Sequence, residues 1–498
     1  PFFSVVPGVI VSKRGLVDLN WAYKQVHFPE SFQSLFDAKF RLAYEEIFAH
    51  LLRLELIRYL RVKNNETGVR FSKHLDDFYK GLPFVIGDSQ LKAVNEIVSD
   101  IFENKYLNRM IIGDVGSGKT VVAASIMWGL GKSGVKSVLM APTQILATQH
   151  YQTLCKFFAP HNISVAQLHG DENSVDMYSD VVVGTHALLY KNLKLRDVGL
   201  VVVDEQHRFG VEQREMLRKK FGEKVHFLSM TATPIPRSLS LVYLGHIDVT
   251  YLESRVDGRK AALTKVVPYK KRSEAYKWIA SYILQRGGRV FVVCPFIAPS
   301  ESVESVRSAT ALYDELASGV FSGLRVCILH GNMSLQEKDN MLRDFKEGVY
   351  DVMVTTPVVE VGIDIPEANF IVIESAERFG LAQLHQLRGR VGRSGQESFC
   401  FLIPTSEDKD ANERLEAMTL THDGFALAEI DLKTRGAGTI LGNLQHGFAV
   451  FQFADISDKE FIDLVRGDVE KYFQSLSDGE IKDLARQLDT FGEMKGLH

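Results

Sequence analysis

Gly113-Asp114-Val115-Gly116-Ser117-Gly118-Lys119-Thr120 has the spacing G-x-x-x-x-G-K-[ST]. It follows the apolar run Met110-Ile111-Ile112 and precedes the helix-favouring run Val121-Val122-Ala123-Ala124. In such a strand–loop–helix context, glycines let backbone N–H groups close on phosphate oxygens, and the helix N-terminus adds its dipole. We therefore predict an ATP site in an α/β domain. Lys119 would reach the β- and γ-phosphates, and Thr120 would ligate Mg²⁺.

Unbroken apolar runs continue this pattern along the chain in two series. The first series is 110–112, 138–140, 181–183, 201–203 and 227–228, and the second is 290–293, 326–328, 352–354, 370–373 and 399–401. Such runs are typical of parallel strands buried on both faces, and their alternation with helical segments indicates doubly wound sheets. The polar segment 253–261 separates the series, so we predict two α/β lobes, 83–252 and 253–405.

Both ends of the chain have a helical pattern. We predict a helical linker region over 1–82, with one amphipathic helix at 34–62 in which Ser34 and Asp37 form a capping box. We expect further helices over 406–498. Basic residues near the end of the long helix would either touch DNA or form a solvated face; they are Arg53, Arg58, Arg61 and Lys63.

Composition sets limits on the class of protein. The chain has 498 residues, 45% hydrophobic and 24% charged, which is typical of two or three globular domains. The net charge of −4 means that nucleic-acid binding would depend on local basic ridges. The four cysteines form no C-x-x-C pair, and no apolar run approaches a membrane span of about 18 residues. We expect a cytoplasmic protein, and, because the first residue is not Met, a fragment.

A pair of carboxylates follows the strand predicted at 201–203. In Asp204-Glu205-Gln206-His207, Asp204 would hold Mg²⁺ and Glu205 would orient the attacking water. A surface turn is the alternative. Upstream, Gln90 can read the adenine edge through its amide, and Phe84 can stack on the base. Gln90 could equally be an ordinary surface glutamine.

The second lobe carries residues suited to a triphosphate held by the first. Gly362 and Asp364 follow a predicted strand and would contact ribose or phosphate. Arg390 and Arg393 in Gln386-Leu387-Arg388-Gly389-Arg390-Val391-Gly392-Arg393 would stabilise charge that develops on the transferred phosphoryl group. Taken alone, such a loop is more often a cluster of salt bridges.

Together these residues resemble the helicases and translocases of superfamily 2 over 83–405, which implies RecA-like lobes. The resemblance makes Phe84 and Gln90 the Q motif and Gln386 to Arg393 motif VI. It assigns contacts with the DNA strand, or coupling to the ATP state, to Thr143, Thr185, His186, His207, Thr231, Thr233, Thr356 and Gln386.

Longer stretches narrow the resemblance to the bacterial RecG family. They are Gly113 to Ala123, Asp204 to Val211, Glu377 to Gln386, and His27-Phe28-Pro29 with Ala38 to Glu46. Thr434-Arg435-Gly436 is similar to the TRG motif of that family, in which a helical hairpin couples lobe closure to movement of the duplex. The resemblance makes Arg435 the pivotal residue of this hairpin.

The chain departs from the family pattern at several positions. Ala437 stands where Pro is usual, Val256-Asp257 replaces Pro-Pro, and Pro357 replaces a Thr of motif V, which puts one strand contact in doubt. The OB-fold wedge domain of the family finds no match in 1–82, so we expect a fragment or a short member.

The resemblance implies an ATP-dependent, Mg²⁺-using double-stranded-DNA translocase that remodels stalled replication forks and Holliday junctions in recombination and repair. Its partners would be branched and duplex DNA and, in the family, a single-strand-binding protein, and we expect a monomer without membrane contact. The alternative is a translocase like the transcription-repair coupling factor, acting on RNA polymerase. An RNA helicase and a nucleotide-gated binding protein without turnover are further alternatives.

Overall fold

The computed structural model describes most of the chain between residues 4 and 490. Residues outside the description within this range are 65–70, 73, 104–106, 169–175, 177, 192–194, 196, 206–210, 223, 235, 237–238, 241, 243–244, 246, 254–261, 296–301, 358–367, 393–396, 406–408 and 436–450. Among helical residues, the side chains at 61–64, 211–212, 214–215, 302–308, 335, 409–411, 435 and 487–490 are likewise outside it.

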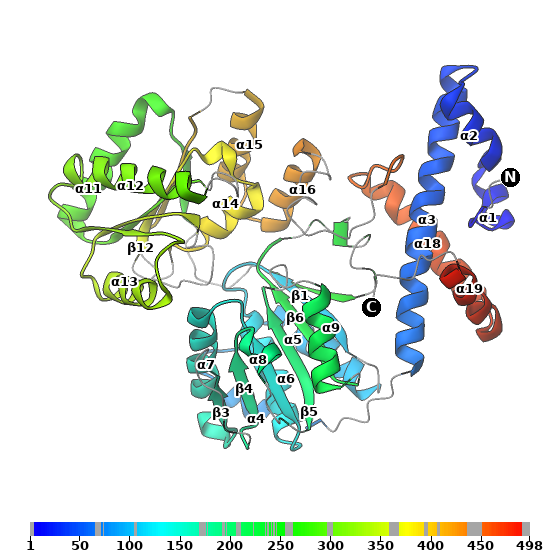
Figure 1. Ribbon diagram of the computed structural model, residues 1–498, viewed down its shortest axis with the longest axis horizontal. Coiled ribbons are helices and arrows are strands. Elements are labelled where there is room, and N and C mark those ends of the chain that lie inside the picture. The colour runs from blue at the N-terminus through cyan, green and yellow to red at the C-terminus, as the bar shows by residue number, and fades with distance from the viewer. Residues whose placement is uncertain are drawn as a thin grey trace.

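Lobe 1 is built on a seven-stranded parallel sheet in the order β3-β4-β2-β5-β6-β1-β7 (Figure 1). Its strands are β1 (Asn108–Gly113), β2 (Lys136–Met140), β3 (Val165–Gln167), β4 (Val181–Gly184), β5 (Val198–Asp204), β6 (His226–Thr231) and β7 (Asp248–Leu252). One face packs on α5 (Asp88–Phe102), α6 (Lys119–Gly131) and α7 (Gln144–Phe158), and the other on α8 (Ala187–Tyr190) and α9 (Val211–Phe221). The sheet is therefore doubly wound.

Lobe 2 repeats this architecture with a six-stranded parallel sheet in the order β10-β11-β9-β12-β13-β8. Its strands are β8 (Leu263–Val266), β9 (Arg289–Val293), β10 (Val326–Leu329), β11 (Val352–Thr355), β12 (Ala368–Glu374) and β13 (Phe399–Ile403). One face packs on α11 (Arg272–Arg286) and α12 (Ser302–Ser318). The other packs on α13 (Leu335–Glu347), α14 (Leu381–Arg388) and α15 (Lys409–Leu420).

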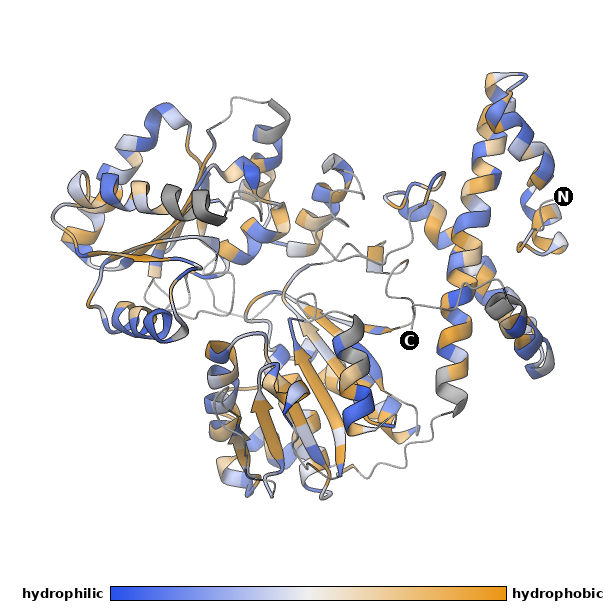
Figure 2. Cartoon of the chain, viewed as in Figure 1, coloured by the Kyte–Doolittle hydropathy of each residue, from blue (hydrophilic) through white to orange (hydrophobic). Residues whose placement is uncertain are grey.

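The ten apolar runs of the sequence are all strands, which confirms the predicted fold class. Figure 2 shows central strands coloured mostly as hydrophobic. Strands β3, β7 and β8 were not predicted from the sequence, and each of these lies at an edge of its sheet. The residues of β3 and β8 are partly exposed, and neither strand carries a continuous apolar run, whereas the edge strand β10 does.

The helices from the two chain ends pack together as one helical module. It contains α1 (Gly8–Arg14), α2 (Leu19–His27), α3 (Phe32–Asn64), α18 (Lys459–Ser475) and α19 (Asp478–Thr490). Tyr44, Phe48 and Val465 belong to the apolar core that α3 shares with α18, and Figure 1 shows α18 crossing α3. The module also contacts lobe 1, because Nε2 of His50 lies 2.7 Å from the carbonyl oxygen of Val242.

The predicted helix at 34–62 lies inside α3, but its predicted cap is wrong. The backbone N–H of Ser34 donates to the hydroxyl of Ser31 at 3.0 Å, so Ser31 supports the first turn. The capping-box pattern requires the side chain of Asp37 to accept from the backbone N–H of Ser34. That carboxylate instead accepts a side-chain hydrogen bond from Gln33.

Two further helices pack against the lobes. Helix α4 (Leu75–Lys80) leads into lobe 1, and α16 (Gly424–Arg435) follows α15 and packs against α14. In the part of the chain that the structure describes, no helix combines the length and the hydrophobicity that crossing a membrane requires. The domain limits predicted from the sequence remain proposals, while the strands of the two sheets span 108–252 and 263–403.

Candidate ATP site and lobe interface

The phosphate loop turns tightly between β1 and α6 through two glycines in left-handed conformation. Gly116 has φ 81° and Gly118, the N-cap of α6, has φ 93°, a region that strains residues with a Cβ. At Gly113, a Cβ would lie 2.6 Å from the hydroxyl oxygen of Ser117. The three glycines therefore allow the loop to close over the start of α6, where Thr120 follows Lys119.

Lys119 folds back over its own loop. Its ammonium donates to the carbonyl oxygens of Gly113 at 2.6 Å and Asp114 at 2.9 Å. Burial lowers the pKa of Lys119, and the nearby carboxylates of Glu205 and Asp204 oppose that effect. A cation with two carboxylates beside it at the start of a helix is the arrangement that a phosphate-binding loop requires.

Asp204 and Glu205, at the end of β5, differ in their titration. Burial alone would raise the pKa of Asp204, but His150 lies 2.8 Å from its Oδ2 and, with Lys119, brings that pKa below its ordinary value. Burial and the charge of Asp204 raise the pKa of Glu205, whose φ of 50° is also left-handed. Two adjacent carboxylates thus have opposite shifts, a pattern suited to one metal ligand and one proton acceptor.

The sequence analysis missed His150. It lies in α7, a helix that begins beyond β2, and nothing in its local sequence separates it from the other histidines. Only the parallel neighbours β2 and β5 bring it to Asp204.

Gln90 contacts the phosphate loop directly. Its Nε2 donates to the carbonyl oxygen of Ser117 at 2.9 Å, and its Oε1 accepts from the backbone N–H of Gly87 at 2.9 Å. A Cβ on Gly118 would lie 2.0 Å from that Nε2. Gln90 is therefore tied to the conformation of the loop, a role that the sequence analysis did not foresee.

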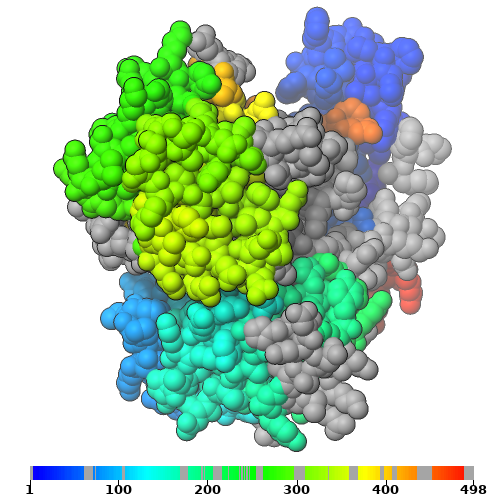
Figure 3. Space-filling view, turned by 60° about the vertical axis from the view of Figure 1, so that its left-hand side comes forward, coloured from blue at the N-terminus to red at the C-terminus, as the bar shows by residue number. Residues whose placement is uncertain are grey.

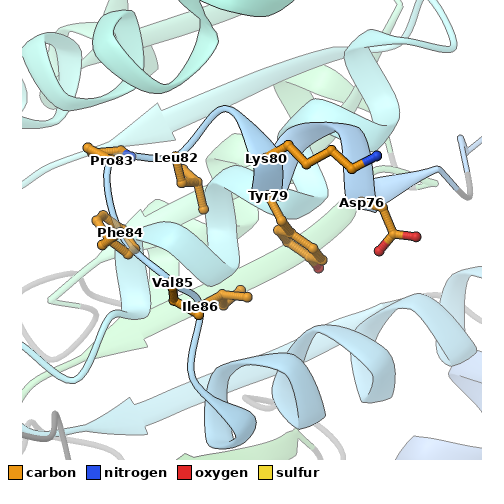
Figure 4. Close-up of a pocket in the computed structure, with 8 residues that line it drawn as sticks. All are labelled: Asp76, Tyr79, Lys80, Leu82, Pro83, Phe84, Val85 and Ile86. Atoms are coloured by element: carbon orange, nitrogen blue, oxygen red, sulfur yellow. The ribbon is translucent and has the colours of Figure 1, made fainter.

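Phe84 lies in the chain that leads to Gln90 and is 44% exposed. Its ring packs edge to face on Phe157 of α7, with 5.8 Å between centroids. It also lines an open cavity of about 640 Å³, shown in Figure 4, together with Asp76, Tyr79, Lys80, Leu82, Pro83, Val85 and Ile86. The partly exposed ring thus borders this open cavity.

A chain of hydrogen bonds runs from Glu205 to the second lobe. Oε2 of Glu205 accepts from the backbone N–H of Ala232 at 3.3 Å and from the hydroxyl of Thr231 at 3.5 Å. The Thr231 hydroxyl accepts from the backbone N–H of Thr233 at 3.1 Å. The Thr233 hydroxyl in turn accepts from Nε2 of Gln386, in α14, at 2.8 Å. The chain connects a catalytic candidate of lobe 1 with lobe 2.

Lobe 2 also meets the phosphate loop itself, and Figure 3 shows the two lobes in contact. A Cβ on Gly389 would lie 3.4 Å from Cβ of Val115. The next residue, Arg390, is 5% exposed, and its positive charge adds to the effect of burial in lowering the pKa of Lys119. The predicted arginine therefore lies at the phosphate loop, although its motif is more than 250 residues away in the sequence.

The remaining predicted residues are placed less closely around the ATP site. Thr143 caps α7 by accepting from the backbone N–H of Leu146 at 3.4 Å. Thr185 and His186 open α8, and burial lowers the pKa of His186. Thr356 is 1% exposed, just beyond β11. His207, Gly362, Asp364 and Arg393 lie outside the described residues, as does the side chain of Arg435, the last residue of α16.

Both lobes match helicase family models. Residues 88–242 match the DEAD/DEAH box helicase family, and residues 274–395 match the helicase conserved C-terminal domain. Both matched ranges lie within the doubly wound lobes described above.

Relatives identify the family within this class. The ATP-dependent DNA helicase RecG of Thermotoga maritima is 43% identical over 480 residues, 94% of this chain and 61% of that protein. The RecG of Streptococcus pneumoniae serotype 4 is 37% identical over 463 residues, 91% of this chain and 68% of that protein. A solved structure of RecG bound to a three-way DNA junction has a TM-score of 0.75 and 40% identity, covering 94% of this chain and 62% of that one. The chain belongs to the RecG family.

Proposed function

We propose that the chain is the motor of an ATP-dependent double-stranded-DNA translocase that remodels branched DNA in recombination and repair. The observation that carries this proposal is that two residues of lobe 2 reach functional groups of lobe 1. Arg390 lies at the phosphate loop, and Gln386 donates a hydrogen bond to Thr233. Such a division of one ATP site between two lobes lets hydrolysis change the angle between them. The chain spans about three fifths of the Thermotoga maritima relative, so branch remodelling is proposed for the whole protein.

The donor set of the site fits ATP with Mg²⁺. Lys119 lies at the N-terminus of α6, where a phosphate could replace the loop carbonyls as its partner. We assign Mg²⁺ to Thr120 and Asp204, because hydroxyl and carboxylate oxygens are its preferred ligands and the pKa of Asp204 is low. Bound Mg²⁺ would neutralise charge on the phosphates.

Protein side chains supply the remaining roles. Glu205 accepts a proton from the attacking water or orients it, consistent with its raised pKa. Arg390, with Arg393, stabilises charge on the transferred phosphoryl group, and Gly362 and Asp364 contact the nucleotide. Phe84 and Gln90 hold the adenine. Because Gln90 also bonds Ser117 and Gly87, its hydrogen bonds would depend on whether nucleotide occupies the phosphate loop.

We propose DNA contacts or coupling for the other motif residues. Thr143 and Thr185 both follow strands at the carboxyl edge of the lobe 1 sheet, the edge at which ligands of such sheets bind. We extend the proposal to His186, His207, Thr356 and Arg435. We also propose that the protein acts as a cytoplasmic monomer, with a single-strand-binding protein as a partner in the family.

The test is the steady-state ATPase rate with forked DNA, linear duplex, single-stranded DNA and RNA, all at one ionic strength because such binding depends on salt. We expect the strongest stimulation from forked or duplex DNA. Stimulation by RNA alone would contradict the proposal. The relatives given above are named RecG, which favours this function over that of the transcription-repair coupling factor; a pull-down with RNA polymerase checks the alternative.

A further inference from the structure

Asp114, the second residue of the phosphate loop, contacts lobe 2 in a way that the proposed chemistry does not use. Its Oδ1 lies 2.9 Å from Nε2 of His385, in α14, and each side chain is 10% exposed. The two residues are 271 positions apart. The contact exists only when the lobes are together, because each lobe supplies one of its members.

The neighbours of His385 determine which of its nitrogens carries the proton. Nδ1 of His385 lies 2.9 Å from Nη2 of Arg388. A guanidinium group can only donate, so Nδ1 accepts and Nε2 carries the hydrogen that is donated to Asp114. The imidazole therefore bridges a carboxylate of lobe 1 and a cation of lobe 2.

Arg388 gives this bridge an electrostatic preference for closed lobes. It is 5% exposed, and it also donates to the carbonyl oxygens of Met418 at 2.7 Å and Thr421 at 3.1 Å, at the end of α15. Burial lowers the pKa of Arg388, and the carboxylate of Asp114 is among the groups that oppose that effect. Closure thus brings a negative charge towards a buried cation, whose burial is otherwise costly.

A third element closes on the same pair. Gly424 is the first residue of α16, and a Cβ there would lie 2.5 Å from Oδ1 of Asp114 and 2.8 Å from Nε2 of His385. Only a glycine lets the helix backbone come this close. The Asp114 carboxylate consequently lies at the N-terminus of a helix, where the helix dipole favours negative charge.

Helix α16 also contacts every major part of the molecule. Phe425 packs on the ring of Tyr251 in lobe 1, with 5.3 Å between centroids. Asp431 accepts from the backbone N–H of Leu381 in lobe 2 at 3.0 Å. Leu432 belongs to the core of the helical module. A change in the angle between the lobes must therefore displace α16 or break one of these contacts.

We propose that Asp114 and His385 are positioning residues that couple closure of the ATP site to α16. Their hydrogen bond forms when lobe 2 docks on the phosphate loop, and Gly424 seats the start of α16 on it. The segment Thr434-Arg435 at the other end of α16 then follows the state of the ATP site. The proposal rests on the proposed ATP-driven function and adds a regulatory contact to it.

The first test is a double-mutant cycle on DNA-stimulated ATP hydrolysis. We expect Asp114→Ala and His385→Ala each to lower kcat about tenfold, with KM for ATP changed less than about twofold, because Lys119 and the loop glycines are untouched. The double variant should be no slower than either single variant. Losses that multiply in the double variant, or a raised KM in Asp114→Ala with His385→Ala silent, would overturn the proposal.

Two further variants separate charge and position. Asp114→Asn keeps an acceptor for His385 but removes the charge, so its loss of kcat should be intermediate. His422→Ala is the matched control: it removes an exposed histidine next to this region, and the rate should stay at the wild-type value. A loss in His422→Ala equal to that in His385→Ala would point to a general disturbance and contradict the specific role.

A glycine pair tests the contact with α16. Gly424→Ala should lower kcat as Asp114→Ala does and should also reduce the base pairs unwound for each ATP hydrolysed, because the methyl group displaces the helix from the pair. Gly467→Ala, in α18, is the control, since a Cβ there has nothing within 4 Å. Wild-type coupling in Gly424→Ala would overturn the proposal.

A measurement independent of activity keeps the proposal distinct from the proposed function. If no nucleic acid stimulates ATP hydrolysis by the wild-type chain, the proposed function is contradicted. Small-angle scattering would still measure the spacing of the lobes and so test the present proposal. Asp114→Ala and His385→Ala should share a radius of gyration larger than that of the wild type and His422→Ala. Equal radii for all four proteins would contradict a role of the pair in closure.

Discussion

The two lobes have the same fold, but they hold their functional groups in different ways. In lobe 1, Lys119 bonds its own loop, Asp204 bonds His150, and Glu205 bonds the segment after β6. In lobe 2, Gln386 and His385 take their partners from lobe 1. Lobe 1 is therefore prepared to bind nucleotide by itself, whereas lobe 2 contributes only when it is docked. Substitution of the lobe 1 groups that would hold the phosphates should affect binding and turnover, whereas substitution of Arg390 or of a residue that bonds across the lobe interface should affect turnover alone.

The largest effect on kcat/KM is expected for Lys119→Ala, because both constants should change. Loss of the loop cation should lower DNA-stimulated kcat by about 10²- to 10³-fold and also raise KM for ATP, because the group contacts phosphate in both ground and transition states. Steady-state kinetics with forked DNA measure both constants. Lys132→Ala, at the far end of α6, is the matched control, since Lys132 bonds only the carbonyl of His161 among its described hydrogen bonds. An unchanged KM would break the contrast between the lobes.

Arg390→Ala tests the other side of the comparison. We expect kcat to fall about 10³-fold, as for other arginines that stabilise phosphoryl transfer, while nucleotide affinity measured by a fluorescent ATP analogue stays the same. Arg325→Ala serves as a control in the same lobe, because it removes an exposed arginine paired with Asp351. A loss of affinity as large as the loss of kcat would show that lobe 2 already binds ATP in the ground state.

The stability of lobe 1 should depend on pH through His226, which is fully buried in β6 and accepts the backbone N–H of Leu107 at 3.1 Å. Burial lowers its pKa from 6.5 to about 4. As the pH falls, the unfolded chain therefore binds the proton before the folded chain does. The contribution of neutral His226 to the free energy of unfolding is fully present above pH 6.5 and is lost as the pH falls towards 4. The loss should reach about 3 kcal/mol in the free energy of unfolding.

Chemical denaturation between pH 7 and pH 4.5 measures this effect. His226→Asn retains an acceptor for Leu107 and does not titrate, so its stability should vary less over this range. An identical pH profile for the variant and the wild type would exclude His226 as the source. Activity at pH 7 should be similar in both, since the residue lies away from the lobe interface.

The smallest effect is expected for the loss of one hydrogen bond between the lobes, the bond from Gln386 to Thr233. Gln386→Ala removes the 2.8 Å bond to Thr233 and should lower kcat about tenfold with KM for ATP unchanged. Gln383→Ala is the control, because that glutamine of α14 caps its own helix through the N–H of Gly380. Thr233→Val combined with Gln386→Ala should be no worse than either alone; multiplying losses would mean that the two act separately.

Central strands and the phosphate loop could be predicted from the sequence because their signals are local. A buried parallel strand is a continuous apolar run, and the loop glycines stand at fixed spacing from Lys119. Edge strands such as β3 and β8 lack that run because one side meets solvent. The position of Arg390 at the loop could be predicted because the phosphate-loop motif and the arginine motif occur in the same chain. The contacts of Arg390 are set by the docking of the lobes.

Long-range pairs left no local signal. His150 meets Asp204 only because β2 and β5 are neighbours. The packing of the two chain ends against each other also had no local signal in the sequence. Asp468, in α18, is 2% exposed and accepts hydrogen bonds from Arg14 at 2.6 Å and Tyr44 at 2.7 Å. From the sequence, Arg14 and Asp468 are only two charged residues 454 positions apart.

The length of α3 has a mechanical consequence. Its 33 residues span about 50 Å. Near its C-terminal end, Arg58 bonds Asp248 at 2.7 Å, in the edge strand β7 of lobe 1, while its N-terminal half packs on α2. A stiff rod of that length amplifies rotation at its attached end. From Arg58 to Phe32 the helix spans about 39 Å, so a tilt of lobe 1 by about 5° would move the far end about 3.4 Å, which is close to the rise of one base pair of DNA.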